Sequence, residues 1–130
     1  MLAAEGVVRD AESNLVSVFS ILEEFTAPGF PIFVPKVCVL TVLERSEADP
    51  PQPRAELRIT LEDQEIHKAP VRVDFQDKLR TRMIVTYAGV ALPNPGILKI
   101  EMLIDGVSVN SVIVRVLLIG KAVIDVKQKG

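Results

Sequence analysis

Residues 54–62 read RAELRITLE, and this stretch decides the fold class. Its four apolar side chains alternate with charged or polar ones, which is the period of a strand with one buried face and one wet face. The same alternation runs through 78–87 and 97–104, and more briefly through 71–75. Residues 37–43 are apolar on both faces, which is typical of a central strand covered on both sides. The pattern therefore predicts an all-β protein.

Composition supports this prediction and sets the size of the fold. The chain has 130 residues, which is the length of one domain. Its 48% hydrophobic content excludes disorder, and its 19 valines and 11 isoleucines favour strands. A single cysteine rules out an internal disulfide, so a reducing, cytoplasmic setting is the simplest expectation. The N-terminal residues lack the pattern of a signal peptide, and no apolar run reaches the length of a membrane span.

Turn-forming residues divide the chain into short strands. Asp105-Gly106 lies between two apolar alternations and predicts a type I′ hairpin, and Gly120-Lys121 suits a further hairpin near the C-terminus. The proline-rich segments 28–35, 50–53 and 93–96 are interpreted as loops, because proline cannot donate to a ladder. Together these signals predict an antiparallel β-sandwich of two sheets with about eight short strands.

Segment 14–25 is open to two interpretations. Its apolar residues fit a strand, but several of them also have helical spacing. We expect the sandwich domain to occupy 1–116, followed by a C-terminal extension at 117–130 with room for an extra hairpin. The expected core consists of inward-facing residues of the clearest strands, namely Leu57, Ile59, Leu61, Val73, Met83, Val85, Ile100 and Met102.

A set of turn and loop segments supports a family resemblance. These segments are AEGVVRD at 4–10, NLVSV at 14–18, FPIFVP at 30–35, LPNPG at 92–96 and the turn at Asp105-Gly106. Their order resembles a bacterial family of uncharacterised all-β domains, over roughly Ala4 to Val116. The chain departs from the family pattern at Ser20-Ile21-Leu22, where the family usually has glycines, and from Leu117 onward, which is extra. The resemblance implies architecture only, since the family has no established activity.

The strongest candidate site is a row of basic residues. Lys78, Arg80 and Arg82 lie on one face of the expected strand 78–87, and Arg72 on a neighbouring segment adds a further cation. Such a row can bind an anion or an acidic partner through charge-assisted bonds. The alternative is a solvated face paired with acidic residues of the adjacent strand. No aromatic residue is interleaved with the row, so a nucleic-acid partner is not expected.

No catalytic, cofactor-binding or metal-binding set is expected. His67 is the single histidine and Cys38 the single cysteine, and we interpret them as a polar turn residue and a small buried side chain. Asp10, Glu12 and Asn14 have the alternate spacing of a calcium loop, but the central glycine and the final glutamate are missing, which favours a polar turn. Carbohydrate binding is not expected either, because aromatic residues make up only 5% of the chain and tryptophan is absent.

These observations favour a non-catalytic interaction or binding module that self-associates, with a dimer as the commonest closed form. The apolar C-terminal run would invite pairing if it lay at an exposed edge. The expected oligomer interface is therefore Val116, Leu117, Leu118, Ile119, Val123 and Ile124. The alternative is a carrier of a small apolar ligand in a cavity between the sheets, which an interior rich in Val, Ile and Leu would allow. An enzyme is not expected.

Overall fold

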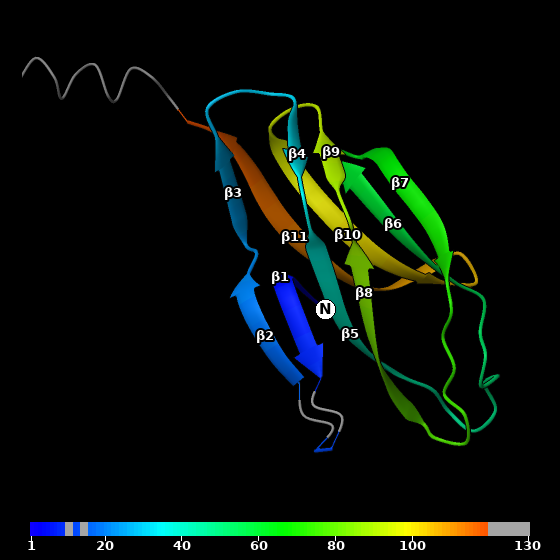
Figure 1. Ribbon diagram of the computed structural model, residues 1–130. Coiled ribbons are helices and arrows are strands. Elements are labelled where there is room, and N and C mark those ends of the chain that lie inside the picture. Colours follow the sequence, from blue (N-terminus) through cyan, green and yellow to red (C-terminus); the bar gives the residue numbers. More distant parts are fainter. Residues whose placement is uncertain (10–11, 14–15, 120–130) are drawn as a thin grey trace, which may run out of the picture.

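The computed structural model describes residues 1–9, 12–13 and 16–119, and in this part of the chain it is built of strands and contains no helix (Figure 1). Its four-stranded sheet has the order β2 (Val16–Ile21), β1 (Leu2–Arg9), β5 (Val37–Glu44), β8 (Arg80–Tyr87). Its five-stranded sheet has the order β3 (Glu24–Ala27), β11 (Val107–Leu118), β10 (Gly96–Ile104), β6 (Ala55–Leu61), β7 (Gln64–Val71). A short pair consists of β4 (Ile32–Val34) and β9 (Val90–Leu92).

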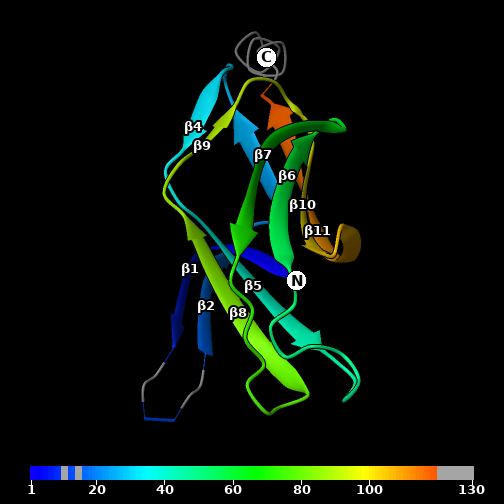
Figure 2. The same cartoon turned by 90° about the vertical axis from the view of Figure 1, so that its right-hand side faces the viewer.

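The two large sheets pack face to face and are offset along the long axis of the molecule. Figure 2 shows β1, β2 and β8 in the lower part of the view and β6, β7, β10 and β11 in the upper part. The short β4–β9 pair continues the β5–β8 ladder at its upper end and keeps the same register. In both pairs the numbers of the two partner residues add up to the same total, as in Val34↔Val90 and Val37↔Tyr87. The four strands thus form one long ribbon, interrupted at Pro35 and Gly89.

The core lies between the inner faces of the two large sheets. It contains the inward residues of β6 and β10, with Leu57 and Met102 fully buried and Ile59 and Ile100 at 1% exposure. Leu61 and Val73 are buried as expected, whereas Met83 and Val85 are only partly buried against the core. Both residues lie on β8, which among the described strands has a neighbour on one side only, so their side chains are less completely enclosed.

The all-β prediction is confirmed, and segment 14–25 contains strands β2 and β3, so the helical alternative is wrong. The expected strand at 71–75 is also wrong. Glu62 and Asp63 both have positive φ, at 48° and 66°, and form a tight turn that starts β7 already at Gln64. The partner strand of β6 therefore ends at Val71, and residues 72–79 form a loop.

Three further details differ from the expected sandwich. The described residues form eleven strands rather than about eight. One of them, β4, lies inside the proline-rich segment 28–35 that was expected to be a loop. The five-stranded sheet is mixed, because β3 runs parallel to the end of β11, where Arg115 pairs with Glu24 and Leu118 with Ala27.

The hairpin at Asp105-Gly106 is confirmed, with φ of 51° and 81°. The hairpin expected at Gly120-Lys121 lies outside the described residues.

Candidate functional site

The outer face of the four-stranded sheet carries an apolar zone, which we define as Leu2, Ile21, Leu40, Val42 and Ile84. These residues share a face because Val37, Val39 and Leu43 of β5 point into the core, so the alternate residues of that strand point outward. Leu2, Leu40 and Ile84 are direct cross-strand partners and form one row over three strands. Four members are at least 36% exposed, with Ile21 the highest at 52%.

The basic row predicted from the sequence lies at one end of this same face. Arg80 and Arg82 pair with Glu44 and Val42 of β5, and Lys78 immediately precedes the strand. All three cationic side chains are exposed. The Arg80 Nε atom lies 3.9 Å from Glu44 Oε1, and both side chains are more than 70% exposed, so this ion pair is weak. The sequence prediction of a basic row on one face thus matches the geometry.

A hollow of about 620 Å³ adjoins the basic row. Its lining combines β8, one residue of β5 and the loop before β8, as Val42, Asp74, Phe75, Gln76, Lys78, Arg80, Thr81, Arg82 and Ile84. The lining contains three cations and one carboxylate, so the hollow is electropositive. Arg72, which the sequence grouped with the row, does not line it.

The loop that faces the basic row is fixed by buried and charged contacts. Phe75 is 4% exposed, and its backbone N–H donates to the Pro51 carbonyl over 2.8 Å. The Arg45 guanidinium lies 5.6 Å from the centre of the Phe75 ring and donates from Nε to the Lys78 carbonyl over 2.9 Å. Asp74 accepts from the Gln76 backbone over 2.8 Å. These contacts hold the start of the basic row in place.

Sequence reasoning missed the contributions of Phe75 and Arg45, whose contacts hold the loop before the basic row. Phe75 was assigned to a strand, and Arg45 lies 33 positions before Lys78. Nothing in a linear pattern places residues at that separation side by side. The nearby turn is also ordered by Asp49, whose carboxylate accepts from the Ser46 backbone and hydroxyl over 3.0 Å each. These bonds, with the charge of Arg45, hold the pKa of Asp49 below its ordinary value.

A second hollow, of about 580 Å³, lies where the ends of the two sheets meet. It shares Val42, Phe75 and Arg80 with the first hollow and extends to residues of the β10–β11 hairpin, such as Ile104 and Val109. Both hollows open to solvent. The Asn110 side chain beside the second hollow donates to the Thr41 hydroxyl over 2.7 Å and so links the two sheets.

The single histidine and the single cysteine lie on different sheets, His67 on β7 and Cys38 on β5. His67 is exposed on β7, and its ring meets the Tyr87 ring edge-on with centroids 5.2 Å apart. Cys38 is 1% exposed, with its Sγ atom 3.5 Å from the Thr86 hydroxyl. Burial raises the pKa of Tyr87, whose hydroxyl has no hydrogen-bond partner in the part of the chain that the structure describes. Asp10 and Asn14 lie outside the described residues.

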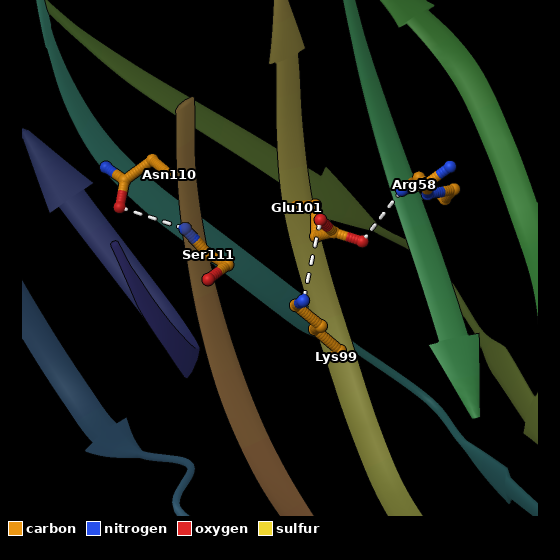
Figure 3. Close-up of polar contacts among 5 residues, drawn as sticks. All are labelled: Arg58, Lys99, Glu101, Asn110 and Ser111. Carbon is orange, nitrogen blue, oxygen red and sulfur yellow. Dashed lines mark hydrogen bonds and ion pairs between the residues drawn. The ribbon is translucent and has the colours of Figure 1, made fainter. Parts of the chain in front are cut away.

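The outer face of the five-stranded sheet contains a charge cluster that the sequence did not predict (Figure 3). Glu101 is 5% exposed, and its two carboxylate oxygens lie 3.1 Å from Arg58 Nη2 and 3.7 Å from Lys99 Nζ. Burial alone would raise the pKa of Glu101, but hydrogen bonds from Ser108 and Arg58 and the charges of Arg58 and Lys99 together hold it below its ordinary value. The cluster is internally paired, which is typical of a structural ion network.

The expected oligomer interface is divided by the fold. Val116 is fully buried and belongs to the core, while Leu117, Leu118 and Ile119 are 41% to 56% exposed. Val123 and Ile124 lie outside the described residues. The edge of this run is covered within the chain, because β3 pairs with Arg115–Leu118. The sequence indicated that this apolar run should not lie at an exposed edge, and β3 covers that edge by pairing with it.

In the described ranges, no group of three or more His, Cys, Asp or Glu side chains could hold a metal ion. Over the same residues, no helix is long and apolar enough to cross a membrane.

Fold and surface together define a β-sandwich domain with one outer face that is apolar in its middle and basic at one end. The model of a family described as "Family of unknown function (DUF6941)" matches residues 1–117. The chain belongs to this family, which confirms the resemblance to an uncharacterised domain. No curated protein and no solved structure matches the chain.

Proposed function

We propose that this domain is a non-catalytic interaction module that self-associates as a dimer through the apolar zone of the four-stranded sheet. The observation that carries the proposal is the row of Leu2, Leu40 and Ile84 across three neighbouring strands, flanked by Val42 and Ile21. Isolated exposed apolar side chains are ordinary on a protein surface, but a contiguous group on one sheet face is typical of an interaction site.

The layout of charge favours a second copy of this chain as the occupant. Along β5 the outward residues run from Cys38 through Leu40 and Val42 to Glu44, so the charges lie at one end of the face, with Arg80 and Arg82 beside them. A two-fold axis that passes through the apolar zone perpendicular to β5 would place the charged ends of the two copies at opposite ends of the interface. Apolar side chains would then meet apolar ones without like charges in contact.

Sedimentation velocity tests the proposal at protein concentrations in the tens of micromolar. We expect the wild-type chain to sediment at twice the chain mass, and Leu40→Glu, at the centre of the row, to raise the dimer dissociation constant by about tenfold or more. Ile113→Glu is the matched control, because Ile113 is 55% exposed on the other sheet. A monomeric wild type, or a Leu40→Glu dimer as tight as the control, would contradict the proposal.

A second candidate function is the carriage of a small apolar ligand. The hollow of about 580 Å³ between the sheet ends favours it by its volume, which is in the range of ligand pockets. Its lining combines the apolar Leu43, Ile104 and Val109 with charged residues, namely Glu44, Arg45, Asp49, Arg80 and Asp105. Native mass spectrometry of the purified chain would detect a retained ligand. Val109→Trp, which fills the hollow, should then remove the added mass, and an unliganded wild type would exclude this candidate.

A further inference from the structure

The outer strand β8 leaves one of its backbone edges without a paired strand. In the described residues the sheet order ends at β8, whose partner is β5. The Arg45 backbone N–H donates to the Leu79 carbonyl over 2.8 Å, which fixes the hydrogen-bonding phase of the ladder. In an antiparallel pair the bonded positions alternate, so the backbone groups of Ile84 and Thr86 point away from β5 toward the open edge. These groups are the pairing positions for an added strand.

The side chains on this edge set its charge. Residues 80, 82 and 84 point to the same outer face, so a strand added beside β8 would place its alternate residues next to two arginines and one isoleucine. Lys78 extends the positive charge at one end. The one carboxylate in the adjoining hollow, Asp74, is already occupied by hydrogen bonds from the Gln76 backbone and the Gln52 side chain.

The edge also has a preformed groove. The hollow of about 620 Å³ lies along the N-terminal half of β8 and is bounded on its other side by the loop of Asp74, Phe75 and Gln76. The buried Phe75 ring and the Arg45 contacts hold this loop. An extended segment can therefore lie against β8 without the loop having to be ordered first, which lowers the cost of binding.

We propose that the open edge of β8 is a docking site for an extended acidic peptide segment of a partner protein, which pairs with β8 and places carboxylates at alternate positions against the basic row. The positive charge of this edge distinguishes an acidic segment from a second copy of the chain as the bound strand. A second copy paired through β8 would offer the basic row no carboxylate, because β8 contains no acidic residue, whereas an acidic segment supplies them at alternate positions. An added strand lies in the plane of the sheet and pairs with the edge backbone of β8, whereas the apolar zone acts through outer-face side chains; the two sites adjoin at Val42 and Ile84, which line the hollow.

Fluorescence anisotropy with a defined probe tests the site. The probe is a fluorescein-labelled peptide with the length of β8, eight residues, with glutamate at alternate positions and threonine between. We expect the wild-type chain to bind it, with affinity that falls as salt is raised from about 50 mM to about 500 mM. Arg80→Ala with Arg82→Ala should weaken binding by about tenfold or more. Lys36→Ala with Arg54→Ala removes the same charge away from the hollow and should leave binding within about twofold.

Two further probes separate strand pairing from simple charge attraction. The same peptide with N-methyl groups at alternate residues keeps its carboxylates but loses backbone donors, and it should bind about tenfold more weakly. Ile84→Pro removes a donor from the open edge and no bond to β5, so it should also abolish binding, whereas Ile84→Ala should not. Circular dichroism checks that each variant is folded, and the methylated peptide tests the site even where a variant fails to fold.

Several results would overturn the proposal. Equal binding of the methylated and plain peptides would show that the edge backbone is not used. Binding that the double arginine variant leaves unchanged would remove the basic row from the site. Anionic vesicles of phosphatidylserine and phosphatidylcholine that bind more tightly than the peptide, and equally well to Ile84→Pro, would identify a membrane surface as the ligand in place of a peptide. Failure of the dimer test would leave this proposal standing, because strand pairing uses the edge backbone of β8, whereas the dimer test changes the side chain of Leu40, which does not line the hollow.

Discussion

Glu101 shows how one acidic side chain can be buried on the outer face of a sheet. Its cross-strand partner is Arg58, and Lys99 lies two positions away on the same strand. The alternation that predicted strand 97–104 correctly assigned Lys99 and Glu101 to the polar face. It could not show that Glu101 is covered by its neighbours, because coverage depends on which strand lies beside it.

We expect Glu101→Gln to lower the free energy of unfolding by about 1–3 kcal/mol near neutral pH, because it leaves the Arg58 guanidinium without its counter-charge. The Nε atom of Arg58 has no hydrogen-bond partner among the described residues, so the loss is not made up there. The folded-state pKa of Glu101 lies below the ordinary value of 4.5, so its stabilisation is present above that pH and is lost as pH falls through the lower folded value. Urea unfolding of both chains checks this. The gap between wild type and variant should narrow below pH 4.5; a constant gap would contradict the charge argument.

Tyr87 presents the opposite case, a buried polar atom without a hydrogen-bond partner among the described residues. Removing the hydroxyl should cost little, so we expect Tyr87→Phe to change the free energy of unfolding by less than about 1 kcal/mol, in either direction. Burial raises the folded-state pKa of Tyr87 above 10.0, so the unfolded chain loses the proton first. Wild-type stability should therefore fall as pH rises past 10.0, by an amount that Tyr87→Phe lacks. Thermal unfolding across this pH range would show whether the two curves separate.

At the scale of elements, strands with one buried and one wet face were predictable from sequence. The alternation in 54–62 and 97–104 matches β6 and β10 to within one residue at each end. Strand β7 was missed because it lies at an edge, contains Pro70 and has no buried position, so it shows no apolar period. The parallel pairing of β3 with β11 could not be predicted either, since it joins residues about 90 positions apart and β3, with four residues, is too short to show a pattern.

Ile59 and Val85 were both expected in the core, but the structure buries them to different extents. Ile59 is 1% exposed in a strand with neighbours on both sides, whereas Val85 is only partly buried on the outer strand β8. We expect Ile59→Ala to lower the free energy of unfolding by about 2–5 kcal/mol and Val85→Ala by about 1–2 kcal/mol. Chemical denaturation measures both, and equal losses would show that the two sites are packed alike.

The interruption in the long ribbon depends on Gly89. This residue has a φ of 113°, and a Cβ atom there would meet the Cζ atom of the Phe33 ring, which lies on the paired strand β4. We expect Gly89→Ala to cost about 1–3 kcal/mol through backbone strain and steric overlap. Phe33→Ala should relieve the overlap but not the strain, so the double variant should lose less stability than the sum of the two singles. Additive losses in denaturant unfolding would show that the ring can move aside freely.

At the scale of the whole molecule, sequence reasoning located half of the candidate site. The period of two placed Arg80 and Arg82 on one face, and the structure shows them there. The other wall of the hollow comes from the loop around Phe75, and its position depends on contacts with Arg45 and Pro51. Those contacts arise only when the ends of two strands and two loops meet, which no local pattern records.

Two surfaces compete as the site of self-association, and a truncation distinguishes them. The sequence pointed to the C-terminal run, whose edge proves to be paired with β3 through Arg115–Leu118 and whose Val116 lies in the core. The structure adds the apolar zone around Leu40, in which Leu2, Ile21, Val42 and Ile84 are each at least 36% exposed. A chain that ends at Ile119 keeps the apolar zone intact and loses Val123 and Ile124. We expect this truncated chain to remain dimeric in sedimentation velocity and Leu40→Glu to raise the dimer dissociation constant in both backgrounds, because burial of contiguous apolar surface drives association. A monomeric truncated chain, with Leu40→Glu still dimeric at full length, would instead assign the interface to the C-terminal segment.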